Sequence, residues 1–439
     1  MGEIRFIDIF AGIGGIRLGF EQAVKELGLT PKCVLTSEIK TSAKKVYSDN
    51  FSNEVIHGDI TKIETTEIPD FDFLLGGFPC QAFSIAGNRG GFADTRGTLF
   101  FEIERILKEK QPMGFLLENV DGLVIHDREK GTDSKIGRTL TIILEHLTNI
   151  GYKPIWKVID SADLGVPQHR RRIYIIGLRS DLITNDDMPL IYERLCNFEK
   201  KETVVGNILE HGLPTSQTDF VKNLLSKYSI SELNGKMLTD KRGGKNNIHS
   251  WDLVETTPKE KQFLDTLLHM RRRKQWAEEI GIEWQDGIPL NINQIKTFWH
   301  EDDTEEMLEH LVSLNVLKKD YPKRLVNVDG IMKRVKDTNL EIGYNIVTVK
   351  FRNELYRILD KNTPSQTLVA TDAKGLYVTD GDGLRRLTHK ECLRLFGFPE
   401  DFKFNVSDKE AYDLLGNSVT VPVIKFVAEQ LLRPIVEKF

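Results

Sequence analysis

The sequence predicts an α/β fold with a doubly wound, mostly parallel sheet and a second, inserted domain. The chain opens with an apolar strand at Ile4–Ile9, a glycine turn and an amphipathic helix from Ile16 to Leu27. A second apolar run, Cys33–Ser37, ends at the acidic Glu38, and a third, Phe73–Leu75, is broken by two glycines. Strands that alternate with helices and end in glycines or carboxylates are typical of nucleotide-binding sheets.

The glycine turn Phe10–Gly15 could bring the backbone close to a ligand. Gly12 and Gly14 remove side chains there, and the following helix offers free N–H groups at its N-terminus. Glu38 could accept hydrogen bonds from ribose hydroxyls, and Asp59 follows another extended piece. The turn alone is also compatible with a purely structural role, and a dehydrogenase would carry the same pattern.

Composition limits the class of protein. The 439 residues are 40% hydrophobic and 28% charged, which is ordinary for a globular chain long enough for two domains. The net charge of -5 indicates that any nucleic-acid surface is local. Four cysteines without C-x-x-C spacing predict neither a disulfide framework nor a metal site. The same cysteine pattern fits a reducing cytoplasm. No apolar run reaches about 18 residues, so we expect no membrane span. The first strand begins within the first few residues, so we expect no signal peptide.

Cys80 directly follows Pro79, whose ring restrains the backbone at this point. On this segment alone, a thiolate nucleophile and a buried free cysteine fit equally well. Four later motifs bear on the choice: Glu118-Asn119-Val120, Gln168-His169-Arg170-Arg171-Arg172, Leu387–Pro399 and Gly416-Asn417-Ser418-Val419.

Together with Phe10–Gly15 and Phe78–Gln81, these motifs resemble, in order, the cytosine-5 DNA methyltransferases of bacterial type II restriction–modification systems. The resemblance covers roughly residues 4–180 and 360–435. It implies a class I fold that uses S-adenosyl-L-methionine to methylate carbon 5 of a flipped-out cytosine in a specific duplex DNA sequence. It also implies a catalytic domain at 1–180, completed by 408–439, and a target-recognition domain at 181–407.

The resemblance assigns a role to each motif. Cys80 would add to the cytosine ring, Glu118 would hydrogen-bond N3, and Arg172, supported by Arg170, would bind O2 or the cysteine-bearing loop. Without the resemblance, Glu118 is also compatible with a surface carboxylate at a strand end, and a solvated charge cluster is the better interpretation of Arg170–Arg172. The implied cofactor residues are Phe10, Gly12, Gly14, Glu38, Asp59, Ile60, Pro79, Leu99, Asn417, Ser418 and Val419. Ile39 and Leu414-Leu415 depart from the family pattern, which has an aromatic at the first site and a glutamine with an aromatic at the second.

Residues that contact DNA are expected in two regions. The glycine-rich loop Ala82–Thr98 could close over a flipped base, and the segment 181–350, which lacks a recognisable motif, would read the sequence. The expected contacts are Gln81, Arg89, Arg96, Lys241, Arg242, Lys245, Asn246 and Asn247. Two further basic clusters are Arg271–Lys274, in a helix predicted over 258–280, and Lys333–Lys336. All three basic clusters of this segment are also compatible with solvated faces.

Three other functions fit parts of the sequence. A tRNA cytosine-5 methyltransferase would share the chemistry, but its usual Cys-Phe-Thr signature is absent. A non-catalytic DNA-binding relative would be expected to lose Cys80 or Glu118, and a dehydrogenase leaves both unexplained. We expect a monomer that associates with the nucleoid through double-stranded DNA, and a cognate restriction endonuclease encoded separately.

Overall fold

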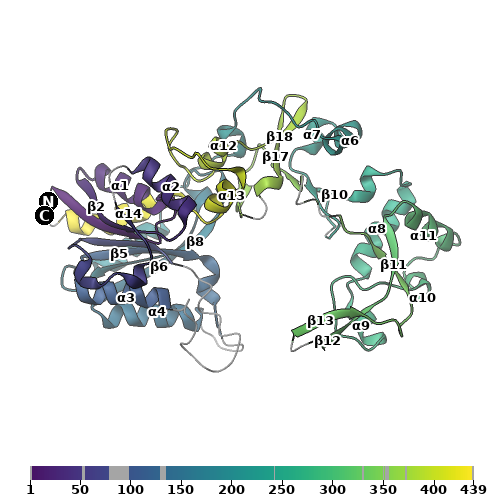
Figure 1. Ribbon diagram of the computed structural model, residues 1–439, viewed down its shortest axis with the longest axis horizontal. Helices are drawn as coiled ribbons and strands as arrows, with labels where there is room; N and C mark the ends of the chain where they lie inside the picture. Colours follow the sequence, from purple (N-terminus) through teal and green to yellow (C-terminus); the bar gives the residue numbers. More distant parts are fainter. Residues whose placement is uncertain are drawn as a thin grey trace. The chain divides into compact units, whose positions relative to one another are not determined.

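The computed structural model describes residues 2–51, 55–78, 98–128, 135–241, 243–328, 331–349, 351, 355–370 and 373–437. The chain forms two compact units (Figure 1). The first, here called the sheet unit, comprises Met1–Glu210, Lys361–Ala373 and Leu387–Phe439, and the second, the middle unit, comprises His211–Asp360 and Lys374–Arg386.

The boundaries of these units differ from the predicted domain limits at 180 and 408. Residues 181–210, 361–373 and 387–407 group with the sheet unit. The cause is packing: α5 (Asp187–Cys196) contacts β6 (Tyr152–Asp160) and α14 (Val421–Val436), and α12 (His389–Arg394) contacts α13 (Asp408–Gly416).

The sheet unit is built on a seven-stranded sheet of order β3-β2-β1-β4-β5-β8-β6. Strand β8 is antiparallel to both of its neighbours, and the other pairings are parallel. The remaining strands are β1 (Glu3–Ile9), β2 (Thr30–Ser37), β3 (Ile56–His57), β4 (Phe73–Gly77), β5 (Gly114–Val120) and β8 (Arg171–Arg179). This topology confirms the predicted doubly wound, mostly parallel sheet.

The two faces of the sheet carry separate cores because side chains alternate along each strand. On β1, Ile4 and Phe6 pack with α1 (Gly15–Glu26), α5 and α14. Ile7 and Ile9 face the opposite core, which contains α3 (Thr98–Lys110) and α4 (Arg138–Asn149). Helix α2 (Thr41–Asn50) follows β2. Helices α1 and α3 thus leave β1 and β4 on opposite faces, which makes the boundary between these strands the topological switch point where ligands bind in such sheets.

Strand β4 is longer than predicted. Gly76 and Gly77 do not break it, because they pair with Leu117 and Glu118 of β5 in the parallel ladder. A second small pairing, β7 (Gln168–His169) with β16 (Ser365–Gln366), joins two distant parts of the sheet unit.

The middle unit contains a five-stranded sheet of order β10-β9-β15-β17-β18 and a helical part with its own apolar core around Trp251 and Phe263. The strands of this sheet are β9 (Met237–Leu238), β10 (Asn247–Ile248), β15 (Arg357–Ile358), β17 (Leu376–Asp380) and β18 (Gly383–Arg386). The helices are α6 (Asp219–Lys227), α7 (Ile230–Leu233), α8 (Pro258–Met270), α9 (Lys274–Glu279), α10 (Ile292–Lys296) and α11 (Thr304–Ser313). Two antiparallel pairs complete the unit: β11 (Leu317–Asp320) with β14 (Gly343–Ile346), and β12 (Lys323–Val328) with β13 (Ile331–Lys336).

The single helix predicted over 258–280 is two helices. Helix α8 ends at Met270, and α9 begins at Lys274 after a turn of three arginines. At this break the Met270 carbonyl accepts hydrogen bonds from the Arg273 N–H at 3.1 Å and from the Trp276 indole at 2.7 Å. The break turns Arg271 inward, where it is buried.

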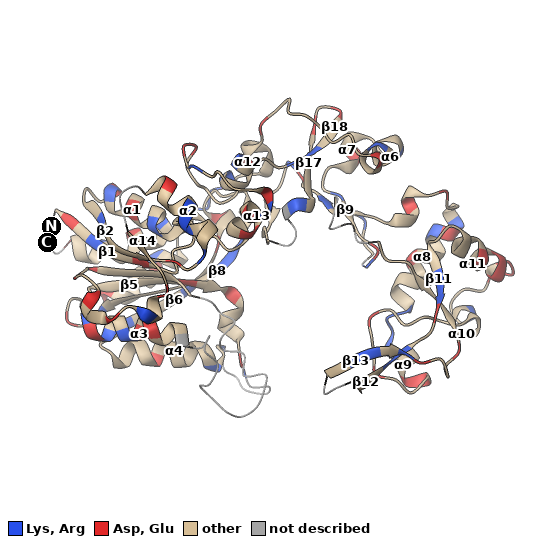
Figure 2. Cartoon of the chain, in the orientation of Figure 1, with Lys and Arg blue, Asp and Glu red and all other residues tan. Residues whose placement is uncertain are grey.

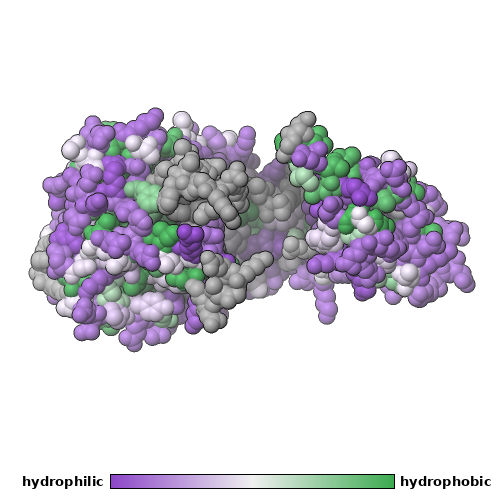
Figure 3. All heavy atoms as spheres, turned by 90° about the horizontal axis from the view of Figure 1, so that it is seen from below, coloured by the Kyte–Doolittle hydropathy of each residue, from purple (hydrophilic) through white to green (hydrophobic). Residues whose placement is uncertain are grey.

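Hydrophilic residues cover most of the face of each unit seen in Figure 3, with hydrophobic residues in smaller patches. Among the described residues, no helix has the length and apolar character that crossing a bilayer requires.

Candidate active site

A pocket of about 670 Å³ lies in the sheet unit, at the edge where β1, β2, β4 and β5 end. Segments from both ends of the chain line it, from the turn after β1 to the residues that precede α14. The predicted residues that line it are Phe10, Gly12, Glu38, Asp59, Ile60, Leu99, Glu118, Arg170, Arg172, Asn417, Ser418 and Val419. The structure therefore brings the predicted catalytic and cofactor residues that it describes, Gly14 excepted, into one cavity.

Gly14 has a different place. It caps α1 in the left-handed conformation with φ 88°, and a Cβ atom there would lie 2.3 Å from the Phe51 ring. Gly14 is therefore needed for close packing and is not among the pocket residues. Six other predicted residues, Pro79, Cys80, Gln81, Arg89, Arg96 and Arg242, lie outside the described residues.

The carboxylate of Glu38 is held by two backbone N–H groups. Gly12 N donates to Oε2 and Lys40 N donates to Oε1, each at 2.7 Å. These bonds join the turn after β1 to the end of β2 and fix the orientation of the carboxylate. Between them, the side chain of Ile39 is 73% exposed although the residue lines the pocket. The pocket thus presents a fixed carboxylate next to an uncovered apolar group.

A second carboxylate, Asp59, lies at the end of β3. Its Oδ1 accepts hydrogen bonds from Thr61 N at 3.1 Å and Thr61 Oγ1 at 2.8 Å, so it caps a short 3-10 turn. Ser37 Oγ donates to the Gly58 carbonyl at 2.7 Å and ties this turn to β2. Backbone contacts therefore fix both Asp59 and Glu38 along one wall.

Glu118 and Arg172 form an ion pair on the opposite wall. Arg172 Nε lies 3.1 Å from Glu118 Oε1, and both side chains are largely buried. Burial raises the pKa of Glu118 above its ordinary value, and the cationic Arg172 and Arg170 oppose this rise. A carboxyl group in this environment can hold a proton at higher pH than a solvated one, so it can donate a hydrogen bond to a ligand.

Asn119 makes a contact that the sequence analysis did not foresee. Its Nδ2 donates to the Phe78 carbonyl at 2.9 Å, and both residues are buried. Phe78 is the last described residue before the segment that contains Cys80. The Glu-Asn-Val motif therefore holds the entry to that segment as well as the carboxyl group beside it.

Arg170 acts on the protein backbone. The residue is 2% exposed, and its guanidinium donates to the carbonyls of Leu368, Gly416 and Ser418 at 3.3, 3.1 and 2.5 Å. It also lies over the Phe396 ring, 5.2 Å from the centroid. Arg170 thus positions the C-terminal wall of the pocket. The support that we predicted it gives to Arg172 on the base-binding face would therefore act through this backbone.

Gln168, in the same motif, makes a parallel connection. Its Nε2 donates to the Leu395 carbonyl at 2.7 Å, and its Oε1 accepts from Leu368 N at 2.8 Å. A buried amide that both donates and accepts can join two backbone segments that form no β-ladder with each other. Its position at the start of the arginine motif was the only sequence signal for this role.

A buried polar cluster lies beneath the glycine turn. Tyr47 Oη donates to Asp8 Oδ2 at 3.1 Å and accepts from Arg17 at 3.1 Å. Burial raises the pKa of Asp8 to about 8, although Arg17 and Tyr47 favour its ionised form. The cluster joins the end of β1 to α1 and α2, which together support Phe10 and Gly12.

The predicted DNA-contacting residues of the middle unit that the structure describes lie in the segment between β9 and the end of β10. Lys245 and Asn246 are exposed on a turn before β10, and Asn247 is half-buried, with its N–H bonded to the Gly244 carbonyl at 3.0 Å. Lys241 lines a separate pocket together with Arg271.

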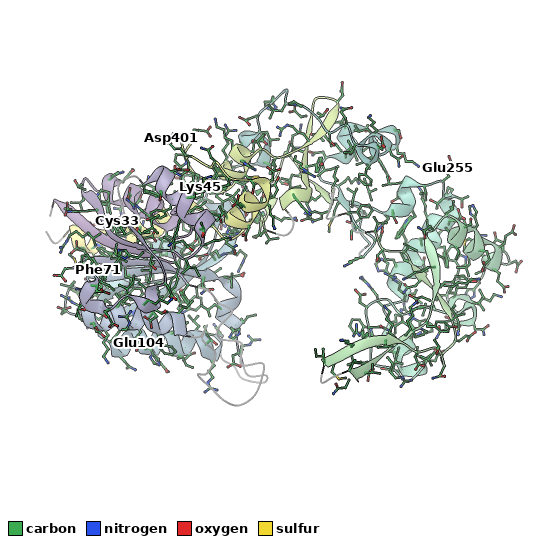
Figure 4. All side chains as sticks on the ribbon, viewed as in Figure 1. Cys33, Lys45, Phe71, Glu104, Glu255 and Asp401 are labelled. Carbon is green, nitrogen blue, oxygen red and sulfur yellow. The ribbon has the colours of Figure 1, made fainter. Side chains whose placement is uncertain are left out.

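The described cysteines are Cys33, Cys196 and Cys392, none of which forms a disulfide with another described residue, and Cys33 lies on β2 (Figure 4). In the part of the chain that the structure describes, no cluster of three or more His, Cys, Asp or Glu side chains could hold a metal ion.

A family model for C-5 cytosine-specific DNA methylases matches residues 4–433. The Type II methyltransferase M.NlaIV of Neisseria lactamica is 53% identical over 99% of this chain and 100% of its own length. M.NgoBV of Neisseria gonorrhoeae, also a Type II methyltransferase, is 51% identical over the same shares.

Two solved structures have a similar fold. The Dnmt2 methyltransferase of S. pombe has a TM-score of 0.53 at 16% identity, and the Entamoeba histolytica methyltransferase EhMeth has 0.51 at 17%; each covers 99% of both chains. The match to the family model and the identity to the Neisseria enzymes extend over nearly the whole chain, including every motif of the pocket. The chain therefore belongs to the C-5 cytosine-specific DNA methylase family, and it methylates carbon 5 of cytosine in DNA.

Proposed function

We propose that the pocket binds S-adenosyl-L-methionine next to a flipped-out cytosine, and that Cys80, Glu118 and Arg172 activate that base. The observation that carries the proposal is the buried pair of Glu118 and Arg172, which lines the same cavity as the fixed carboxylate of Glu38. One wall therefore suits the methyl donor, and the other suits a base that must accept a proton or hydrogen bond.

The donor set of the first wall fits the proposed cofactor. Glu38 and Asp59 offer carboxylate oxygens to ribose hydroxyls and to an adenine amino group, and Phe10, Ile39 and Ile60 offer apolar surface to a ring. When bound, S-adenosyl-L-methionine supplies a methyl group on a positively charged sulfur. The adenine ring would cover the exposed Ile39. Burial of this apolar side chain would compensate for the absence of the aromatic residue that is common at this position.

The proposed nucleophile is Cys80. Only Pro79 separates it from Phe78 in the sequence, so its Cα lies within about 7 Å of the Phe78 Cα. Phe78 lines the pocket, and Asn119 holds its carbonyl. The cationic field of Arg170 and Arg172 favours a thiolate in this region.

The chemistry requires these groups together. The Cys80 thiolate adds to carbon 6 of cytosine, and Glu118 donates its proton or a hydrogen bond to N3, so that electron density moves to carbon 5. Carbon 5 would then take the methyl group, while the bond from that methyl carbon to the donor sulfur breaks and its electron pair stays on the sulfur. Loss of the carbon 5 proton to a base and expulsion of the thiolate restore the aromatic ring. Arg172 would stabilise the developing charge at O2 while it holds Glu118.

The target base has to leave the stack to enter the pocket, so another surface has to recognise the surrounding DNA sequence. We further propose that the middle unit is this surface. The similarity to Type II methyltransferases supports a place in a restriction–modification system. The proposal includes a separately encoded endonuclease and a monomeric methyltransferase that works in the cytoplasm on nucleoid DNA.

Replacement of Cys80 by Ala should abolish methyl transfer to duplex DNA, because carbon 6 then has no nucleophile. Binding of S-adenosyl-L-methionine should stay close to wild type by calorimetry. The matched control is Cys196→Ala, which removes an exposed thiol from α5. Turnover of the Cys80 variant within tenfold of wild type would contradict the assignment.

Glu118→Gln should slow the single-turnover rate by about 10²-fold or more, the scale of a positioned acid. In the wild type, the protonated acid persists to a higher pH than a free carboxyl because burial raises its pKa. The rate should therefore fall as pH rises through that pKa, and this fall should vanish in the variant. The control is Glu104→Gln, on α3 (Figure 4). A normal rate in Glu118→Gln would show that the residue is structural.

Glu38→Gln should weaken binding of S-adenosyl-L-methionine. The amide places a donor against the N–H of either Gly12 or Lys40, and loss of one charged hydrogen bond costs about 1.5–3 kcal/mol, or roughly 10- to 150-fold in affinity. The exposed Glu109→Gln on α3 serves as control. Equal affinities in calorimetry would exclude Glu38 from the cofactor site.

A further inference from the structure

The hairpin β12–β13 of the middle unit is unusually open to solvent. All six residues of β13 are exposed, and Ile331 and Met332 are 61% and 55% exposed. The hairpin pairs with no other strand among the described residues. A two-stranded ribbon of this kind is only marginally stable in water by itself, so its exposed length is costly to keep without a partner.

The register divides the ribbon into two faces. Lys323, Leu325 and Asn327 lie opposite Lys336, Arg334 and Met332, and because directly paired residues share a face, these six form one basic side. The other side carries Arg324, Val326, Val328, Ile331, Lys333 and Val335. Lysine and arginine therefore occur on both sides of the ribbon. Part of β13 is blue in Figure 2 because it carries basic residues.

Some of these cations are already paired and others are not. Lys336 contacts Asp320 at 2.7 Å, and Arg324 contacts Asp337 at 2.8 Å. Lys323 and Lys333 form no ion pair within the described part of the chain. Their ammonium groups are available to an anionic partner.

A basic pocket of about 350 Å³ lies at the root of the ribbon. Lys323 and Arg334 of the ribbon line it, together with Lys241, Arg271 and Lys318. Two acidic residues, Asp286 and Asp320, also line it and are bound by Arg272 and Lys318. The cationic side chains outnumber the acidic ones, so the pocket suits an anion.

Arg271 is the buried cation of this pocket. The residue is 5% exposed, its NH1 donates to Asn345 Oδ1, and its Nε has no partner among the described residues. Gly287 has φ 85°, and a Cβ atom there would lie 3.2 Å from the guanidinium carbon. Burial and the neighbouring Arg272 lower the pKa of Arg271 to about 10, so it stays charged at neutral pH. A buried charge without a full set of partners is stabilised by a bound anion.

We propose that the ribbon and the pocket form one DNA-binding surface, in which β12–β13 enters the major groove and the pocket holds a backbone phosphate beside it. The inference rests on the proposed role of the middle unit in sequence selection. A major groove about 12 Å wide admits a two-stranded ribbon, and lysines on both sides can then reach the two phosphate walls. Asn327 and Arg334 are of the residue types that pair with base edges.

Salt dependence of binding tests the phosphate contacts. We compare the double variant Lys323→Gln/Lys333→Gln with Lys222→Gln/Lys227→Gln, which removes two exposed charges from α6 of the same unit. Binding of the full-length protein to duplex DNA is measured as a function of salt concentration. The ribbon variant should show a slope of log affinity against log salt that is less steep by about 1–2, because each lost phosphate contact removes about one released counterion. The α6 variant should keep the wild-type slope.

Base choice tests the groove placement. Asn327→Ala and Arg334→Gln should each reduce discrimination at one base pair by roughly 5- to 150-fold, measured as methylation of a randomised duplex library. Retention of wild-type base choice in both variants would overturn the placement of the ribbon in the groove.

Three results would overturn the phosphate contacts: a wild-type salt slope in the ribbon variant, an equal loss in the α6 variant, or calorimetric binding of inorganic phosphate that Lys323→Glu abolishes without a change in DNA affinity. The wild-type protein is assayed for DNA methylation in the same experiments. If it methylates DNA, the proposed function holds even where one of these results rules out the phosphate contacts.

Discussion

The buried guanidinium of Arg170 is the interaction on which the sheet unit depends. It donates to carbonyls that lie 198, 246 and 248 positions farther along the chain. A guanidinium without acceptors at this depth would be strongly unfavourable, so the C-terminal segments have to be in place for the unit to be stable. Ser418 and Val419 line the pocket, and Val419 packs against Gly15 at the start of α1. The site is therefore complete only when both ends of the chain have folded together.

The fold and most of the pocket in the sheet unit could be predicted because their signals are local. Short apolar runs determine β1 and β4, and carboxylates at strand ends converge at one edge of a parallel sheet. The sequence was less informative about residues whose roles depend on packing in the folded chain. We expected Gly14 to face a ligand, but its missing side chain leaves room for the Phe51 ring. Arg170 and Asn119 appeared in motifs, but only the folded chain shows which carbonyls they bind.

The middle unit could not be predicted in the same way. Its contacts join residues far apart in sequence, and its charged runs look the same whether they are solvated or bound to a ligand. The Arg271–Lys274 cluster suggested the exposed side of one helix. The helix instead breaks at this cluster and buries Arg271, and the distant Gly287 and Asn345 surround it. The sequence placed the lysines of β13 in a basic cluster, but its register with β12, which puts Lys323 beside the pocket, is a tertiary property.

The proposed reaction depends most on attack of Cys80 on the target base beside Glu118. The most direct measurement uses duplex DNA in which 5-fluorocytosine replaces cytosine, with S-adenosyl-L-methionine present. Carbon 5 then carries fluorine in place of the proton that must leave, so the protein–DNA adduct persists. Mass spectrometry of the digested adduct should locate the nucleotide on Cys80. An adduct on Cys33, Cys196 or Cys392, or no adduct from a protein that methylates ordinary DNA, would contradict the account.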